Sequence, residues 1–106
     1  MYWEKIEDDR VILTFDVTNS GPAVKSFELY LYVTGSDGSR LYGDSYVFNR
    51  TSAVPIAPGE TVRSDRFVVP QWSSISTVYC GVRKIVFENG ETVTIPGVDY
   101  EMYEVR

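Results

Sequence analysis

The stretch FELYLYV, residues 27–33, alternates apolar residues with Glu28, Tyr30 and Tyr32. Successive side chains of a β-strand point to opposite faces of a sheet, so the apolar residues would all lie on one face. They are Phe27, Leu29, Leu31 and Val33. This strict alternation predicts a half-buried strand whose apolar row faces a core. The two tyrosines then lie on the face that points away from that core.

A second segment with the same alternation precedes this strand. In VILTFDVTNS, residues 11–20, the apolar row is Val11, Leu13, Phe15 and Val17. The turn formers Asn-Ser-Gly-Pro at 19–22 end it, and an Asp-Gly pair at 37–38 predicts another turn after the strand over 25–34. We therefore expect two strands whose inner rows supply one core. The inner residues would include Leu13, Phe15, Leu29 and Leu31.

Turn signals divide the rest of the chain into further short extended segments. Residues 41–49 and 61–69 are typical of strands, and the serines within 71–77 favour a single helical turn or an irregular crossover. The Asn-Gly pair at 89–90, between two β-branched segments, is the strongest hairpin signal in the chain. The apolar phase changes within the segment before this pair, which predicts a bulge near Arg83.

About seven strands at roughly ten-residue intervals, with no helix-length 3.6-residue period, predict an all-β protein built as an antiparallel β-sandwich. The 106 residues suit one domain, 1–106, because a chain of this size buries enough surface for one core. We expect the core of the domain within residues 11–95. The tail, 96–106, alternates again and forms either a C-terminal edge strand or an extension toward another domain.

Charge and cysteine content exclude several classes of function. The formal net charge is −5 and the basic residues are scattered, so neither nucleic acid nor an anionic membrane surface is an expected partner. The sequence has no apolar run long enough to insert into a membrane. Cys80 is the only cysteine, which excludes an internal disulfide, and we expect it to pack as a small hydrophobe.

Catalysis, a metal site and a cofactor are not expected. The chain has no histidine for general base catalysis near neutral pH, and no serine lies in a GxSxG or SxxK motif. We interpret the acids at 7–9 as a solvated lead-in to the first strand. Asp37, Asp44 and Asp65 offer oxygen atoms to calcium if folding gathers them, but their spacing matches no EF-hand loop.

Three motifs occur in a characteristic order: FDVTNSG at 15–21, SDGS at 36–39 and IAPGET at 56–61. With WSSISTVYCGVRKIVFENGETVTI at 72–95, this order resembles the FxLYD-type domains and related bacterial immunoglobulin-like domains of unknown function. The resemblance covers roughly residues 11–95. It implies an immunoglobulin-like fold and, commonly, a bacterial envelope or secreted setting, and it transfers no catalytic residues.

The compartment stays open at this point. The acidic N-terminus lacks the basic region and the apolar run of an export signal. We expect an extracellular or cell-envelope location if the chain is part of a larger exported protein, and a cytoplasmic one otherwise.

Tyr30, Tyr32, Trp72 and Tyr79 are the candidate binding residues. Their flat amphipathic rings suit a sugar ring or a protein partner, because they offer contact area and have few rotatable bonds. The alternative is structural: tyrosines often cover the outer face of a sheet, and we expect Trp72 to plug the end of the core. For Tyr30 and Tyr32 the sequence leaves both roles open.

The leading hypothesis is a noncatalytic immunoglobulin-like module of a bacterial protein, which binds a protein partner or serves as a structural spacer. One alternative is a carbohydrate-binding module that uses exposed tyrosines. Another is a small acidic inhibitor, phage-encoded or cytoplasmic, that imitates phosphate charge. We expect a monomer or a weak dimer, because an open sheet edge invites pairing between chains.

Overall fold

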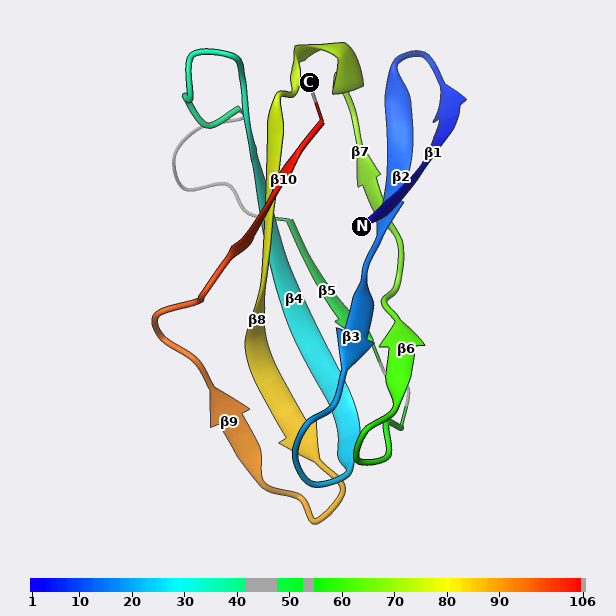
Figure 1. Ribbon diagram of the computed structural model, residues 1–106, viewed down its shortest axis with the longest axis vertical. Helices are drawn as coiled ribbons and strands as arrows, with labels where there is room; N and C mark the ends of the chain where they lie inside the picture. Colours follow the sequence, from blue (N-terminus) through cyan, green and yellow to red (C-terminus); the bar gives the residue numbers. More distant parts are fainter. Residues whose placement is uncertain (42–47, 53–54, 106) are drawn as a thin grey trace.

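The computed structural model describes residues 1–41, 48–52 and 55–105, and for 48–52 it describes the backbone alone. Its regular elements are β-strands, paired in antiparallel sheets, and a short 3-10 turn (Figure 1). Within these ranges there is no α-helix, and no helix is long and apolar enough to cross a membrane. The expectation of an all-β protein is therefore confirmed.

One group of strands begins at the N-terminus. β1 (Tyr2–Glu7), β2 (Arg10–Thr14) and β7 (Phe67–Val69) form a sheet in the order β1-β2-β7. After one residue β2 continues into β3 (Asp16–Thr18), which pairs with β6 (Thr61–Arg63). β3 and β6 lie below β2 and β7 in Figure 1, so these strands form two short ladders in succession.

The other sheet is built on the two longest strands. β4 (Val24–Thr34) and β8 (Thr77–Phe87) pair along almost their full length. β10 (Glu101–Glu104) and β5 (Phe48–Ser52) flank them in the order β10-β8-β4-β5, and β9 (Thr92–Thr94) pairs with the C-terminal part of β8. Part of the tail 96–106 is thus an edge strand of this sheet.

The buried apolar side chains form one cluster that both groups of strands share. β2 contributes Val11 and Leu13, β7 contributes Phe67, and β4 contributes its whole apolar row. The four inner residues expected from the sequence are between 0 and 3% exposed: Leu13, Phe15, Leu29 and Leu31. Their predicted burial is confirmed. The opposite face of β4, called the outer face below, carries the half-buried Tyr30 and Tyr32.

The alternating segments 11–17 and 61–69 were each expected to form one strand, and the structure divides both. Leu13 pairs with Phe67 and Asp16 pairs with Arg63, so two residues of the first segment lie opposite three of the second. The extra residue makes a β-bulge. Ser64 lies in this bulge: its hydroxyl oxygen accepts the Phe15 N–H at 3.0 Å, and its N–H donates to the Phe15 carbonyl at 2.8 Å.

The acids at 7–9 are exposed, as expected, but they do not lead into the first strand, because Glu7 ends β1. β1 and β2 form a hairpin whose turn residues, Asp8 and Asp9, have φ values of 43° and 59°. Aspartate tolerates this left-handed conformation better than most residues, which explains the turn. The Asp9 carboxylate accepts hydrogen bonds from the Ser73 N–H (2.9 Å) and hydroxyl, and the Asp9 carbonyl accepts the Trp72 N–H.

Several local predictions are confirmed. The residues 72–74 form a single 3-10 turn, η1 (Trp72–Ser74). A hairpin joins β8 and β9 at the Asn-Gly pair, where Gly90 has a φ of 92°. The pairing of β4 with β8 shifts register so that Arg83 has no partner in β4, which is the predicted bulge. Most of the segment predicted at 41–49, including Asp44, lies outside the described residues, and its last two residues belong to β5.

Candidate binding surface

Tyrosine and arginine side chains from four segments of the chain gather on the outer face of the β4–β8 pair. Because the apolar row of β4 points into the core, its alternate residues point outward, and the same holds for Tyr79 next to the buried Val78 and Cys80 of β8. We call this set the tyrosine face. It consists of Tyr30, Tyr32, Arg40, Tyr79, Arg83 and Tyr100.

Tyr32 lies at the centre of the tyrosine face. It pairs with Tyr79 across the two strands, and the rings stack with centroids 4.5 Å apart and planes 10° apart. The guanidinium carbon of Arg40 lies 3.9 Å from the centroid of the Tyr32 ring. The Tyr79 ring and the Arg40 guanidinium are both too close to the Tyr32 ring to lie on the same face of it. Both faces of the Tyr32 ring are therefore covered within the chain.

Tyr100 joins this group from the segment before β10. Its ring meets Tyr32 edge to face, with centroids 4.9 Å apart and planes 78° apart. Burial raises the pKa of Tyr100, while the nearby Arg40 guanidinium lowers it by less. The phenol thus stays neutral at physiological pH and keeps its hydroxyl as a hydrogen-bond donor.

A glycine allows this arrangement. Tyr30 pairs with Gly81 of β8, and a Cβ atom at Gly81 would clash with the Val98 side chain and lie 2.9 Å from the Asp99 carbonyl oxygen. Only a residue without a side chain therefore lets residues 98–99 cross β8 this closely. That crossing delivers Tyr100 to the tyrosine face.

Arg83 occupies the bulge of β8 beside this crossing. Its guanidinium donates to the Ile95 carbonyl at 2.6 Å, and its central carbon lies 5.7 Å from the Tyr30 ring. The Ile95 carbonyl therefore fixes the guanidinium end of the Arg83 side chain. Because the bulge adds one residue to β8, Arg83 can turn toward the outer face without breaking the alternation of the strand on either side.

Three of the four candidate residues named from the sequence belong to the tyrosine face: Tyr30, Tyr32 and Tyr79. Trp72 does not. It is 9% exposed within the buried cluster, and its ring centroid lies 5.5 Å from that of Trp3, a residue that is 55% exposed. Sequence reasoning missed Arg40, Arg83 and Tyr100, because their approach depends on a turn, a bulge and a crossing segment. The only signal for Tyr100 was the alternation of the tail.

Other groups with potential chemistry are held in unreactive settings. Burial, and secondarily the Glu101 carboxylate, raise the pKa of the Cys80 thiol to about 12. Burial also raises the pKa of Tyr103, whose hydroxyl donates to Glu101 at 2.7 Å. In the described part of the chain, no three acidic or cysteine side chains are gathered in a way that would hold a metal ion.

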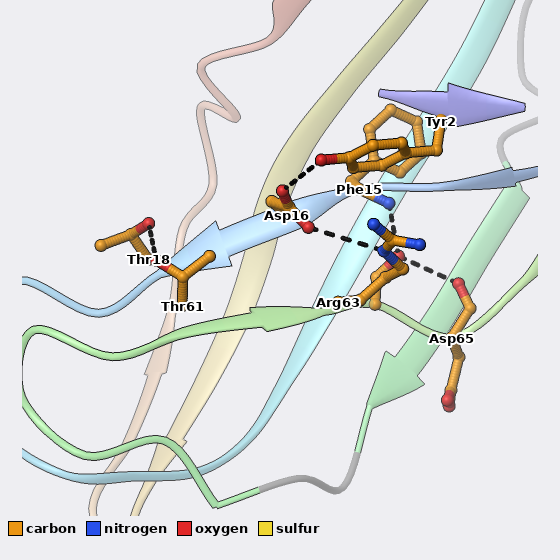
Figure 2. Close-up of polar contacts among 8 residues, drawn as sticks. Tyr2, Phe15, Asp16, Thr18, Thr61, Arg63 and Asp65 are labelled. Atoms are coloured by element: carbon orange, nitrogen blue, oxygen red, sulfur yellow. Dashed lines mark hydrogen bonds and ion pairs between the residues drawn. The ribbon is translucent and has the colours of Figure 1, made fainter.

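A second polar cluster lies on the outer face of β3 and β6. The Tyr2 hydroxyl donates to Asp16 at 3.0 Å, and Arg63 lies 3.7 Å from Asp16 and 3.8 Å from the Tyr2 ring (Figure 2). Next to this group, the hydroxyls of Thr18 and Thr61 meet across the two strands. The cluster ties β1 to β3 and β6 and supplies a pair, Tyr2 and Arg63, that resembles Tyr30 and Arg83 in composition.

Comparison of the chain with protein-family models, curated proteins and solved structures finds no match. The resemblance to FxLYD-type domains therefore stays a prediction. The function has to be argued from the geometry of the chain itself.

Proposed function

We propose that the chain is a noncatalytic immunoglobulin-like β-sandwich module that binds a protein partner through the tyrosine face. Support for the architecture comes from the strand orders β1-β2-β7 and β10-β8-β4-β5 and from the buried cluster that they share. In an immunoglobulin-like sandwich, strand B pairs with E in one sheet, and C pairs with F and F with G in the other. The strands β2, β7, β4, β8 and β10 have the corresponding neighbours.

The observation that carries the binding proposal is the packing of the tyrosine face. Tyrosine and arginine are the residues that most often dominate protein–protein interfaces, because they combine large contact area with directed polar groups. Here Tyr32 and Tyr79 hold each other in place by stacking, and the Ile95 carbonyl holds Arg83. Little side-chain freedom is then lost on binding, which favours affinity. Arg40 and Arg83 favour a partner that presents carboxylates.

The contacts of the chain support the three alternative functions less well than protein binding. A sugar ring stacks on a free aromatic face, and both faces of the Tyr32 ring are covered. An inhibitor that imitates nucleic acid needs a continuous acidic band, whereas Asp16 and Glu7 each pair with an arginine. A structural spacer requires no preorganised surface at all.

The decisive experiment compares two matched double variants. Tyr30→Ala with Arg83→Glu alters the tyrosine face, and Tyr2→Ala with Arg63→Glu alters the equivalent pair in the cluster of Figure 2. Immobilised wild-type protein is used to capture partners from an extract of the source organism, and the affinity for each captured protein is measured by calorimetry. We expect the first variant alone to weaken binding by about 30-fold or more, as loss of an interface hot spot does.

Three results would contradict this proposal. Equal losses in both variants would show that the tyrosine face is not the contact surface. A captured partner whose amide chemical-shift changes map elsewhere on the chain would exclude the face directly. Binding on a glycan array that Tyr30→Ala abolishes would favour the carbohydrate alternative instead.

A further inference from the structure

The strand ladder beside β3 is incomplete. β1 pairs with β2 from Thr14 back to Arg10, and Tyr2 is the partner of Thr14. β2 continues through Phe15 into β3, whereas β1 begins at Tyr2, the partner of Thr14. Among the described residues, β3 pairs with β6 along one edge and with no strand along the other.

The hydrogen bonds of this segment show which backbone groups face the vacant position. The Asn19 N–H donates to the Glu60 carbonyl at 3.0 Å, and the Phe15 carbonyl accepts the Ser64 N–H. Successive residues of a strand direct their N–H and C=O groups to alternate edges. Residues 15, 17 and 19 therefore face β6. Asp16 and Thr18 direct their backbone groups to the vacant position, as a strand added there would require.

Open cavities lie beneath the same edge. One, of about 250 Å³, is lined mainly by apolar side chains that include Val17, Ile85 and Phe87. A second, of about 210 Å³, shares Val17 and Val82 with the first and extends toward β10. These four side chains are only half-buried, although they pack against the core. The vacant position thus leaves apolar surface of the core partly uncovered.

Acidic side chains line the second cavity. The second cavity is lined by Asp16, Asp99 and Glu101 and by no basic side chain. The Asp16 side chain is 45% exposed, and its partner Arg63 also lies over the Tyr2 ring. Asp99 and Glu101 are exposed. A chain that lies beside β3 would therefore gain from lysine or arginine near these carboxylates.

We propose that the vacant position is a binding site for an extended segment of a partner protein, which pairs antiparallel with β3. Alternate apolar side chains of that segment cover Val82, Ile85 and Phe87, and a basic side chain lies near Asp99 and Glu101. The backbone groups of Asp16 and Thr18 form hydrogen bonds with this segment, and the cavities determine which of its side chains fit. This site lies between the strand groups, and it adjoins the tyrosine face only where residues 98–99 cross Gly81.

The register of β1 allows a direct test. Because Tyr2 pairs with Thr14, the second residue placed before Met1 would come opposite Val17. Six residues are therefore added before Met1, with valine at the second and fourth positions upstream and lysine or threonine at the others. The control has the same composition with the valines moved by one position, which turns them to the solvent face.

We expect the first fusion to melt about 5 °C above the unextended chain, which corresponds to roughly 1 kcal/mol for a domain of this size. It should also slow amide hydrogen exchange at Asp16 and Thr18. The shifted control should do neither. Equal melting temperatures for the two fusions, or unchanged exchange at both amides, would overturn the proposed site.

A second measurement tests binding in trans. A free peptide of alternating valine and lysine is titrated against the unextended chain, with a lysine–threonine peptide as control. We expect the valine peptide to bind and Glu101→Lys to weaken it by about tenfold, as loss of one charged contact does. Equal binding of the two peptides would exclude an apolar cleft site. Concentration-dependent protection of Asp16 and Thr18 without peptide would assign the position to a second copy of the chain.

Discussion

Gly81 shows how a single residue shapes the candidate surface. The absence of its side chain lets residues 98–99 cross β8 and bring Tyr100 to Tyr32. No other residue type fits there without moving the Asp99 backbone, since even a Cβ atom would approach the Asp99 carbonyl oxygen to 2.9 Å. The contact between the tail and the tyrosine face therefore depends on this glycine.

We predict that Gly81→Ala destabilises the chain by about 1–3 kcal/mol, the usual range for overpacking. The variant should also separate Tyr100 from Tyr32, which near-ultraviolet circular dichroism and urea unfolding would detect together. Gly97→Ala is the matched control, because a Cβ atom there meets no other atom within 4 Å. If both variants unfold at the same urea concentration as wild type, the crossing is looser than described.

Cys80 provides a prediction on pH. Its pKa rises from 9.0 to about 12 in the folded chain, chiefly through burial. A thiol with a raised pKa stabilises the folded state fully below pH 9, and this contribution falls as the pH rises from 9 toward 12. Urea unfolding at pH 8, 10 and 11 should show a steeper loss of stability for wild type than for Cys80→Ala. Parallel losses in the two proteins would assign the effect to other groups.

At the scale of elements, the junction between the β2–β7 and β3–β6 ladders depends on Ser64. This side chain is 6% exposed, accepts the buried Phe15 N–H and donates to the Asp65 carbonyl at 3.0 Å. A backbone N–H without an acceptor inside a protein is costly. Ser64 therefore allows one ladder to end and the next to begin within the buried region.

Ser64→Ala should lower the free energy of unfolding by about 1–3 kcal/mol, because it leaves the Phe15 N–H unpaired. The amide exchange rate of Phe15 should rise in the same variant. Ser36→Ala, at an exposed turn position, is the control and should change stability by less than about 0.5 kcal/mol. An unchanged Phe15 exchange rate would mean that another acceptor replaces the hydroxyl.

At the scale of the whole molecule, the open edges govern association. β10 is an edge strand and carries Glu101 and Glu104, both exposed. Charged residues on an edge discourage pairing with other chains, and two copies of β10 side by side would bring these carboxylates together. The edge of β1 also carries exposed charges, among them Glu4 and Lys5.

We therefore predict a monomer or a weak dimer in solution. Light scattering at increasing protein concentration should give the mass of one chain, about 12.0 kDa, at low concentration. Replacing both Glu101 and Glu104 with threonine should increase association, since it removes the repulsion at the edge. A stable higher oligomer of the wild-type chain would contradict this prediction.

The amino-acid sequence specified many features that depend on near neighbours, although the β1–β2 hairpin at Asp8 and Asp9 was not predicted. Alternation identified the core rows of Leu13 and Leu29, and turn chemistry located the Asn-Gly hairpin at 89–90. The same alternation placed Tyr30 and Tyr32 on one outer face. These results follow because the side-chain period of a strand and the φ preference of glycine act over a few residues.

Folding alone specified how distant segments meet. The bulge opposite Phe15, the anchoring of η1 by Asp9, the crossing of residues 98–99 over Gly81 and the vacant position beside β3 all join residues far apart in the chain. Period-two patterns indicate which face of a strand is buried, but not which strand lies next to it, since backbone hydrogen bonds are nearly independent of sequence. Both proposed binding sites depend on those neighbours. The sequence named Tyr30, Tyr32 and Tyr79 of the tyrosine face, but it gave no sign of the position beside β3.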